Sequence, residues 1–308
     1  MKKRYLDVLG RDASVIVFGT VPVGSSASET ESFAMLDAYA AMGGNFIDLA
    51  RAYGDGAAEE TVGRWLRRTP SDMIIATKGG LPGSDKQPRL DRASLLSDIR
   101  KSLDALGIEQ VDMYWLHRDD PARDVEDILH TANELVQMGY TRCVGVSNWG
   151  LDRIREAQDC ALTKGYLPFA ASQPQWSLAR MEIYEDPTLV QMDDAMRLWH
   201  EKSRLPCIPF SSQAKGFFQK LATGGEDALS AKAKRRYLSP RNLRIFDAVI
   251  DIHRQTGLSV GGIALGYLTS HSFPVFPIAG ASSVAQVQAW EACDLPDWAM
   301  DMLQTAIG

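Results

Sequence analysis

The sequence predicts an α/β fold, a (β/α)8 TIM barrel with a short N-terminal hairpin and a long loop after the seventh strand. Eight short apolar segments recur along the 308 residues, and helical patterns separate them. Three consecutive segments end on chemically active side chains, which a parallel barrel would bring to one face. No Gly-x-Gly-x-x-Gly motif follows a segment, so an open dinucleotide-binding sheet is disfavoured. We expect residues 1–308 to form a single domain.

The first half of the chain supplies the hairpin and four strands. Residues 1–12 are expected to form the hairpin, with Gly10–Asp12 as its turn. The strands are predicted at Val15–Thr20, Phe46–Ile47, Met73–Thr77 and Val111–Leu116. Helical patterns lie at about 28–42, at 57–68, from the cap Asp91 to Gly107, and before Gly139.

The second half supplies four more strands and one segment that breaks the rhythm. The strands are predicted at Cys143–Val146, Phe169–Ser172, Pro206–Phe210 and Phe273–Ile278. Between the last two, Phe217–Arg244 mixes glycines, alanines and a basic run before a helix at Ile245. A long insertion between barrel units is often a lid or a binding loop. We expect this loop to serve the site, with a solvated insertion as the alternative.

Composition excludes several classes of protein. The hydrophobic fraction of 45% and the charged fraction of 23% are ordinary for a soluble globular chain. The net charge of −6 argues against a nucleic-acid partner, and the densest basic run, Lys232–Arg236, is expected to be a solvated loop face. No apolar segment approaches the ~20 residues of a membrane span, and none follows the basic start as in a signal peptide. We therefore expect a cytoplasmic protein without a membrane partner.

The cysteines and histidines do not suggest a metal centre. The four cysteines show no close metal-ligand spacing, and the five histidines form no His-x-x-x-His pair. Cys143 and Cys207 fall inside predicted strands, which suits reduced, buried thiols in the cytosol. The sequence therefore predicts no metal cofactor.

Four polar residues mark the ends of three consecutive strands. Asp48 ends one strand and Tyr53 follows in a glycine-rich turn, while Lys78 and His117 end the next two strands. A phenol has a pKa near ~10, and a nearby ammonium such as that of Lys78 would lower it toward neutral pH. Each residue also has a structural alternative: an ion pair for Asp48 and Lys78, a turn aromatic for Tyr53, and a strand cap for His117. The joint occurrence of all four favours chemistry.

The set Asp48, Tyr53, Lys78 and His117 resembles the catalytic tetrad of the aldo-keto reductase superfamily, and the resemblance runs over nearly the whole chain. It implies an NAD(P)(H)-dependent oxidoreductase that interconverts a carbonyl (an aldehyde, ketone or keto-sugar) and an alcohol by hydride transfer. Tyr53 would be the general acid/base, and His117 would hydrogen-bond the same oxygen and orient the substrate. In the superfamily, the loop after the seventh strand folds over the dinucleotide.

The resemblance also implies which residues bind the dinucleotide. Ser147, Asn148 and Gln173 match the trio that hydrogen-bonds the nicotinamide carboxamide. Phe210 stands where many relatives place an aromatic against the nicotinamide, with barrel packing as the alternative. The loop that approaches the pyrophosphate matches Ser211, Ala214, Lys215 and Gly216. The remaining expected cofactor-binding residues are Gly19, Thr20, Asp48, Gly280, Ser282 and Gln286.

Two departures from the superfamily concern the adenosine end. Relatives commonly have Gly-x-Arg or Gly-x-Lys after strand eight, whose cation binds the 2′-phosphate of NADP, whereas this chain has Gly280-Ala281-Ser282. Trp290 occupies a place near the adenine where relatives often carry asparagine. We therefore expect NADP(H) to be favoured only narrowly over NAD(H), unless Lys232–Arg236 or Arg241 replaces the missing cation.

The sequence leaves the small-molecule substrate and the oligomeric state open. Tyr53, Trp149 and Trp176 are expected near strand ends, where they could form an aromatic-walled pocket. Arg118 could bind substrate hydroxyls there; the alternative is that it helps to cap the helix near Arg123. Two other functions stay open: a redox-sensing subunit that binds dinucleotide but turns over slowly, and an aldolase on the same barrel that forms a Schiff base on Lys78.

Overall fold

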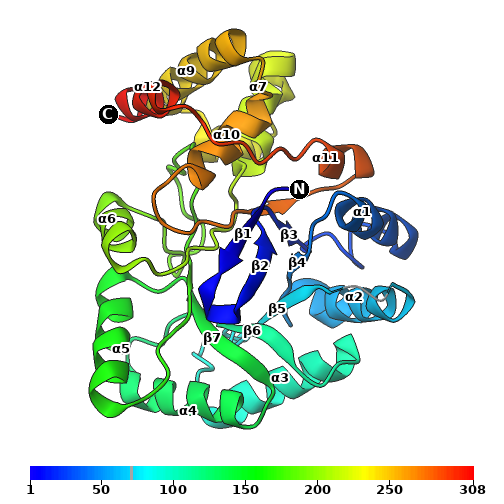
Figure 1. The fold of residues 1–308 in the computed structure, drawn as a ribbon, viewed down its shortest axis with the longest axis vertical. Coiled ribbons are helices and arrows are strands. Elements are labelled where there is room, and N and C mark those ends of the chain that lie inside the picture. The colour runs from blue at the N-terminus through cyan, green and yellow to red at the C-terminus, as the bar shows by residue number, and fades with distance from the viewer. Residues whose placement is uncertain (70–71) are drawn as a thin grey trace.

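A computed structural model describes residues 1–69 and 72–308, in which helices surround a central sheet (Figure 1). In this part of the chain, seven parallel strands form one sheet in the order β8-β7-β6-β5-β4-β3-β9. Their bounds are β3 Val17–Gly19, β4 Phe46–Asp48, β5 Ile74–Gly79, β6 Val111–Leu116, β7 Thr141–Ser147, β8 Ser172–Gln173 and β9 Ile278–Gly280. The predicted (β/α)8 TIM barrel is confirmed.

The barrel closes between β8 and β9 through isolated bridges instead of a regular strand. One bridge joins Ser172 to Cys207 and a second joins Cys207 to Val275. Proline has no N–H to donate to a ladder, so a proline-rich segment forms only interrupted pairing. The prolines that interrupt it are Pro206, Pro209, Pro274 and Pro277. The predicted seventh strand is therefore reduced to bridges, and the eighth is shorter than expected and lies later in the chain.

An antiparallel hairpin, β1 (Lys3–Leu6) with β2 (Arg11–Ser14), lies across the barrel in Figure 1. A 3₁₀ turn at Asp7–Leu9 joins its strands, so the prediction of a turn at Gly10–Asp12 is wrong by a few residues. Leu6 and Leu9 pack with the side chains of the barrel interior. The hairpin contacts Asn45, just before β4, and therefore covers the end of the barrel opposite the strand ends that carry the predicted site.

Helices follow the strands as the sequence predicts. Ser28 caps α1 with a capping box, Asp91 caps α3, and Gly107 ends α3 in the left-handed conformation. Asp124, and not the segment after His117, caps α4. The helices are α1 Glu29–Ala41, α2 Ala57–Arg68, α3 Arg92–Leu106, α4 Val125–Gln137, α5 Leu151–Lys164, α6 Asp194–Ser203, α7 Phe217–Gly224, α8 Ala231–Tyr237, α9 Pro240–Thr256, α10 Val260–Thr269, α11 Val284–Gln288 and α12 Asp297–Ile307. None of these helices is long and apolar enough to cross a membrane.

The segment predicted as a long loop after the seventh strand is mostly helical. It contains α7, a 3₁₀ turn, α8 and the start of α9. Ser230 and Ser239 accept backbone N–H groups at the starts of α8 and α9, and Pro240 suits the first turn of a helix. The basic run Lys232–Arg236 lies on α8, so it is not a loop face. Its cations gather around Glu185.

Candidate active site

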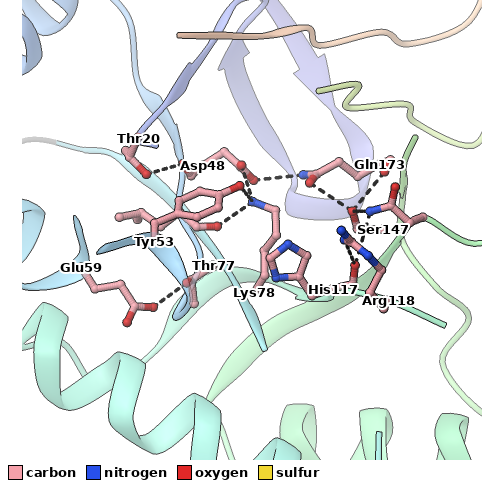
Figure 2. A network of polar contacts seen from close by, with 12 residues as sticks. Thr20, Asp48, Tyr53, Glu59, Thr77, Lys78, His117, Arg118, Ser147 and Gln173 are labelled. Atoms are coloured by element: carbon pink, nitrogen blue, oxygen red, sulfur yellow. Dashed lines mark hydrogen bonds and ion pairs between the residues drawn. The ribbon is translucent and has the colours of Figure 1, made fainter. Parts of the chain in front are cut away.

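The four tetrad residues converge at the carboxyl ends of neighbouring strands (Figure 2). Asp48 is the last residue of β4, and Lys78 is next to last in β5. His117 directly follows β6, and Tyr53 opens a short 3₁₀ turn after β4. Because parallel strands end at one face of the barrel, elements distant in sequence deliver these side chains to one place.

Lys78 is the centre of the polar network. Its Nζ donates hydrogen bonds to the Asp48 carboxylate, to the carbonyl oxygen of Leu49 at 2.6 Å and to the Tyr53 hydroxyl at 3.3 Å. Gln173 Nε2 donates to the other Asp48 oxygen at 3.0 Å. Asp48 and Lys78 are each only 2% exposed. A buried ion pair held by further hydrogen bonds fixes the lysine in one position.

The pKa shifts in this network favour a charged lysine and a neutral tyrosine. Burial acts to lower the pKa of Lys78, but Asp48 and Tyr53 together outweigh it and the net pKa is raised. Burial raises the pKa of Tyr53 above its ordinary value, and the Lys78 ammonium only opposes that rise. Lys78 thus acts in the expected direction on the pKa of the phenol, but burial outweighs it, so the net pKa does not fall toward neutral pH. Tyr53 keeps its proton at neutral pH and can donate it.

His117 lies beside Tyr53 as a neutral imidazole. The two ring centroids are 6.3 Å apart at an interplanar angle of 84°. Burial, followed by the charges of Lys78 and Arg118, lowers the pKa of His117 well below its ordinary value. Its Nδ1 is buried and has no hydrogen-bond partner in the described residues. The ring is therefore an unsatisfied polar group next to the proton donor, as a substrate-orienting residue would be.

A second buried network, which the sequence analysis missed, holds the Tyr53 turn in place. Glu59 of α2 is fully buried, and one of its oxygens lies 2.6 Å from the Thr77 hydroxyl (Figure 2). Its other oxygen lies 2.8 Å from Arg51 Nη1. Arg51 Nη2 donates to the carbonyl oxygen of Asp55 at 3.1 Å. Arg51 therefore ties the turn that carries Tyr53 to α2 and to the strand of Lys78. The available signal was a glutamate within the apolar face of a helix.

The predicted nicotinamide residues form a connected chain of hydrogen bonds. The Ser147 hydroxyl donates to the carbonyl oxygen of Gln173 at 3.1 Å, and Asn148 Nδ2 donates to that hydroxyl at 3.1 Å. Asn148 Oδ1 accepts the backbone N–H of Val190 at 3.2 Å. Gln173 also bonds Asp48, so the chain is continuous with the tetrad. The structure thus brings these three residues together beside the lysine–aspartate pair.

The predicted pyrophosphate loop has a strained backbone. Ser211, Ala214 and Lys215 have φ values of 55°, 48° and 60°, which side-chain-bearing residues rarely adopt, and Gly216 has 73°. Such strain clusters at ligand-binding sites. Phe210, just before the loop, packs partly buried against the barrel interior.

Positive charge gathers beside this loop. Desolvation, then Arg236, Lys232 and Lys220, lower the pKa of Lys215, which shows that these cations crowd one another. Only Glu185 pairs with more than one of the α8 cations among the described residues, at 3.1 Å from Lys232 and 2.7 Å from Arg236. The cluster keeps surplus positive charge, as an anion-binding loop requires.

At the adenosine end, Ser282 and Gln286 contact each other. The Ser282 N–H donates to Gln286 Oε1 at 2.8 Å, and both residues are exposed. Gly280 has open space where a Cβ would lie. Trp290 is buried against Phe18, at a centroid distance of 5.6 Å, so its indole belongs to the core.

Gly19 and Thr20 lie at the end of β3. A Cβ at Gly19 would lie 2.7 Å from an Ile278 methyl group, so close packing already requires this glycine. The Thr20 hydroxyl donates to the carbonyl oxygen of Asp48 at 2.9 Å. Gly19 therefore lets β3 pack closely on β9, and Thr20 ties the end of β3 to the end of β4.

The two tryptophans predicted to line the substrate pocket pack against rings other than that of Tyr53. Trp149 packs on Phe169 at a centroid distance of 5.3 Å, and Trp176 stacks on Phe273 at 6.0 Å. Neither indole forms an aromatic contact with Tyr53 or His117 in the described part of the chain. The charge of Arg118 acts to lower the pKa of Tyr53 and of His117. Its guanidinium, however, already donates hydrogen bonds to Asp186 and Thr188. Arg118 therefore pins a loop and is not a free group for substrate hydroxyls.

The described residues contain no group of three or more His, Cys, Asp or Glu side chains placed to hold a metal ion. All four cysteines are free thiols.

Comparison with known proteins identifies relatives that are named as reductases and dehydrogenases. A model of the aldo/keto reductase family matches residues 15–304. The aldo-keto reductase ausK of Aspergillus calidoustus is 27% identical over 288 residues, covering 84% of this chain and 67% of the relative. Norsolorinic acid reductase of Aspergillus flavus is 24% identical over 296 residues, covering 91% and 73%. An aryl-alcohol dehydrogenase [NADP(+)] of Phanerodontia chrysosporium is 25% identical over 292 residues, covering 89% and 75%.

Solved structures show the same fold. A thermostable aldo-keto reductase in complex with the inhibitor epalrestat superposes with a TM-score of 0.75, at 22% identity, over 99% of this chain and 100% of the other. An aldo/keto reductase from Klebsiella pneumoniae in complex with NADP and acetate superposes with a TM-score of 0.71, at 21% identity, over 98% and 93%. Since the family model matches all but the two ends of the 308 residues, the chain belongs to the aldo/keto reductase family.

Proposed function

We propose that this chain reduces a small-molecule carbonyl to an alcohol, and runs the reverse reaction, with Tyr53 as the general acid/base. The observation that carries the proposal is the Tyr53 hydroxyl at 3.3 Å from a buried Lys78 ammonium, beside the unsatisfied imidazole of His117. A neutral phenol and a neutral imidazole can both hydrogen-bond one carbonyl oxygen. Lys78 then stabilises the phenolate that remains after the proton has moved.

The nicotinamide dinucleotide supplies the hydride when it is bound. The chain's own residues would hold two parts of it: Ser147, Asn148 and Gln173 the carboxamide, and the cationic loop at Lys215 the central pyrophosphate. The surplus positive charge beside that loop fits an anionic ligand. Tyr53 Oη gives its proton to the substrate oxygen in reduction and recovers one from the alcohol in oxidation. Lys78 and Asp48 stay charged throughout and keep the phenol oriented.

NADP(H) is the proposed cofactor, favoured only narrowly over NAD(H). Two relatives support the choice, because one is named for NADP(+) and another was solved with NADP. Ser282 argues for weak discrimination, since an exposed hydroxyl carries no charge to match a 2′-phosphate.

Aromatic aldehydes and ketones are the first substrates to test. The relatives are named for aryl alcohols and for norsolorinic acid, and the proposal extends that class to this chain. Following the nicotinamide absorbance with a panel of aryl aldehydes, aliphatic aldehydes and keto-sugars would identify the class. Faster turnover of every keto-sugar than of any aryl carbonyl would remove the aromatic assignment.

Replacing Tyr53 by phenylalanine tests the central role. Tyr53→Phe should lower kcat by roughly two to four orders of magnitude, as expected for loss of a general acid. Dinucleotide affinity, measured by fluorescence quenching, should stay nearly unchanged. Retention of more than about a tenth of the rate would exclude Tyr53 as the proton donor.

A Schiff-base aldolase is disfavoured by the state of Lys78. Its raised pKa and its three hydrogen bonds keep the amine protonated, whereas a Schiff base needs the neutral amine. Borohydride in the presence of substrate should therefore leave no adduct on Lys78. A redox-sensing subunit would instead give a single burst of oxidation without sustained turnover, which the same absorbance assay detects.

A further inference from the structure

A cavity of about 580 Å³ lies outside the barrel, among residues of α6, α10 and α12, whose positions Figure 1 shows. Its walls come from these helices, from the start of α9 and from the loop of residues 174–193, which joins β8 to α6. None of Asp48, Tyr53, Lys78 and His117 lines it. The cavity is therefore separate from the catalytic site described above, and its volume is in the range of small-molecule sites.

Three aromatic residues are among those that line the cavity. Trp176 and Tyr267 are buried, with centroids 6.2 Å apart at 75°, and Tyr184 is partly exposed. Burial raises the pKa of Tyr267 to about 12, so its hydroxyl is a neutral donor at ordinary pH. Flat rings and one hydroxyl suit a ligand with a flat, apolar body.

Three arginines line the same cavity, and two of them have no carboxylate partner. Arg197 lies 3.5 Å from Asp194 and 2.6 Å from Glu201, so its charge is balanced. Arg180 and Arg241 form no ion pair within residues 1–69 and 72–308, and Arg241 Nε is buried without a hydrogen-bond partner. Buried donors are normally satisfied, so the unpartnered Arg241 Nε in the cavity wall indicates a missing acceptor, while the exposed Arg180 adds a second positive charge at the same cavity.

Other acidic groups do not supply that acceptor. Asp193 also lines the cavity, but its Oδ1 accepts the Met196 N–H at 2.7 Å and caps α6. Asp194 is the partner of Arg197 and its side chain is largely exposed. The terminal carboxylate of Gly308 lines the cavity too, but it forms no ion pair with Arg180 or Arg241 in the described residues. These two guanidinium groups therefore have donors that an anion from outside the chain would engage.

We propose that this cavity is a second ligand site, which binds a small organic anion of the aryl carboxylate class. The carboxylate would bond the Arg241 and Arg180 guanidinium groups, and the ring would lie against Trp176 and Tyr267. The site does not depend on the proposed catalysis. The 174–193 loop also reaches the catalytic side, through Asp186 to Arg118 at 3.0 Å, so an occupant would brace that contact.

Benzoate is the probe, titrated into the full-length chain by isothermal calorimetry. Saturable binding is expected, and Arg241→Met should weaken it by about tenfold or more, as for loss of a charge-assisted hydrogen bond. Arg180→Met, at an exposed position where folding is not at risk, should weaken it as well. Arg244→Met, three residues further along α9 at an exposed position outside this cavity, is the matched control and should change nothing.

Three further titrations distinguish this cavity from the catalytic site and from a general anion site. His117→Ala should leave benzoate affinity intact, because His117 belongs to the catalytic site, and this readout needs no turnover. Benzyl alcohol and inorganic phosphate should each bind at least tenfold more weakly than benzoate. No saturable binding, equal weakening by Arg241→Met and Arg244→Met, or weakening by His117→Ala alone would each overturn the proposal. Phosphate binding as tight as benzoate would overturn the assignment to an organic anion.

Discussion

At the residue scale, Lys78 acts on Tyr53 through charge. The ammonium lowers the phenol pKa against the larger effect of burial, so its removal must raise that pKa further. Reduction requires protonated Tyr53, and the rate therefore falls as pH rises through its pKa. Lys78→Met should move this basic limb to higher pH and lower the maximal rate. A pH–rate profile measures both effects, and a limb that moves to lower pH would contradict the assignment.

The proposed narrow preference for NADP over NAD rests on the uncharged side chain of Ser282. An arginine there could form a charge-assisted bond to a 2′-phosphate, worth roughly 1.5–3 kcal/mol, or about one to two orders of magnitude in affinity. Ser282→Arg should therefore tighten NADP binding and leave NAD binding almost untouched, as measured by fluorescence quenching. Ser283→Arg, at the neighbouring exposed position, is the control. A wild-type preference for NADP above about a hundredfold would contradict the reasoning from Ser282.

At the scale of single elements, α2 holds the turn of Tyr53 through one buried carboxylate. Glu59→Gln should cost about 3 kcal/mol of unfolding free energy, since it removes one partner of a buried ion pair. It should also lower kcat severalfold with little effect on dinucleotide affinity, because Arg51 no longer fixes the turn. Glu60→Gln, at the next and exposed position, should change neither quantity. Denaturation and steady-state kinetics together test this, and a stability loss with unchanged kcat would leave Glu59 a structural role only.

At the scale of the whole molecule, the hairpin plugs one end of the barrel and the chemistry occupies the other. Leu6→Ala should destabilise the protein by about 3 kcal/mol, the usual cost of a large-to-small change in a core. The rate per folded molecule should not change, because Leu6 lies at the far end from Tyr53. Tyr5→Ala, at an exposed position of the same strand, is the control for chemical denaturation. A large loss of kcat in folded Leu6→Ala protein would show that the two ends are coupled.

Much of this architecture could be predicted because the deciding patterns are local. Asp48, Lys78 and His117 each follow an apolar run, and strand ends in a parallel barrel meet at one face. The closure of the barrel could not be predicted in detail, since it depends on how prolines such as Pro209 interrupt pairing between distant segments. The helices of the expected loop were hidden because their short apolar faces pack against other elements.

Within the site, the missed features are those that depend on distant partners. Glu59 finds Arg51 and Thr77 only after folding, and no spacing rule reveals such a partner. The pKa of Tyr53 was expected to fall because the sequence shows the charge of Lys78 but not the burial around it. Arg118 looked available for substrate until the 174–193 loop supplied Asp186. Charges can be read from a sequence, whereas desolvation and saturation of donors cannot.

The left-handed backbone at Ser211, Ala214 and Lys215 has a consequence for directed evolution. Each such residue costs roughly 1–2 kcal/mol relative to a relaxed conformation. Substitutions that relieve this strain should therefore raise the free energy of unfolding. Ser211→Gly should raise the melting temperature, as a thermal shift assay would show, while a looser loop binds the dinucleotide less tightly. A screen for thermostability alone should therefore select glycine in this loop and yield variants with a higher melting temperature and a lower affinity for the dinucleotide.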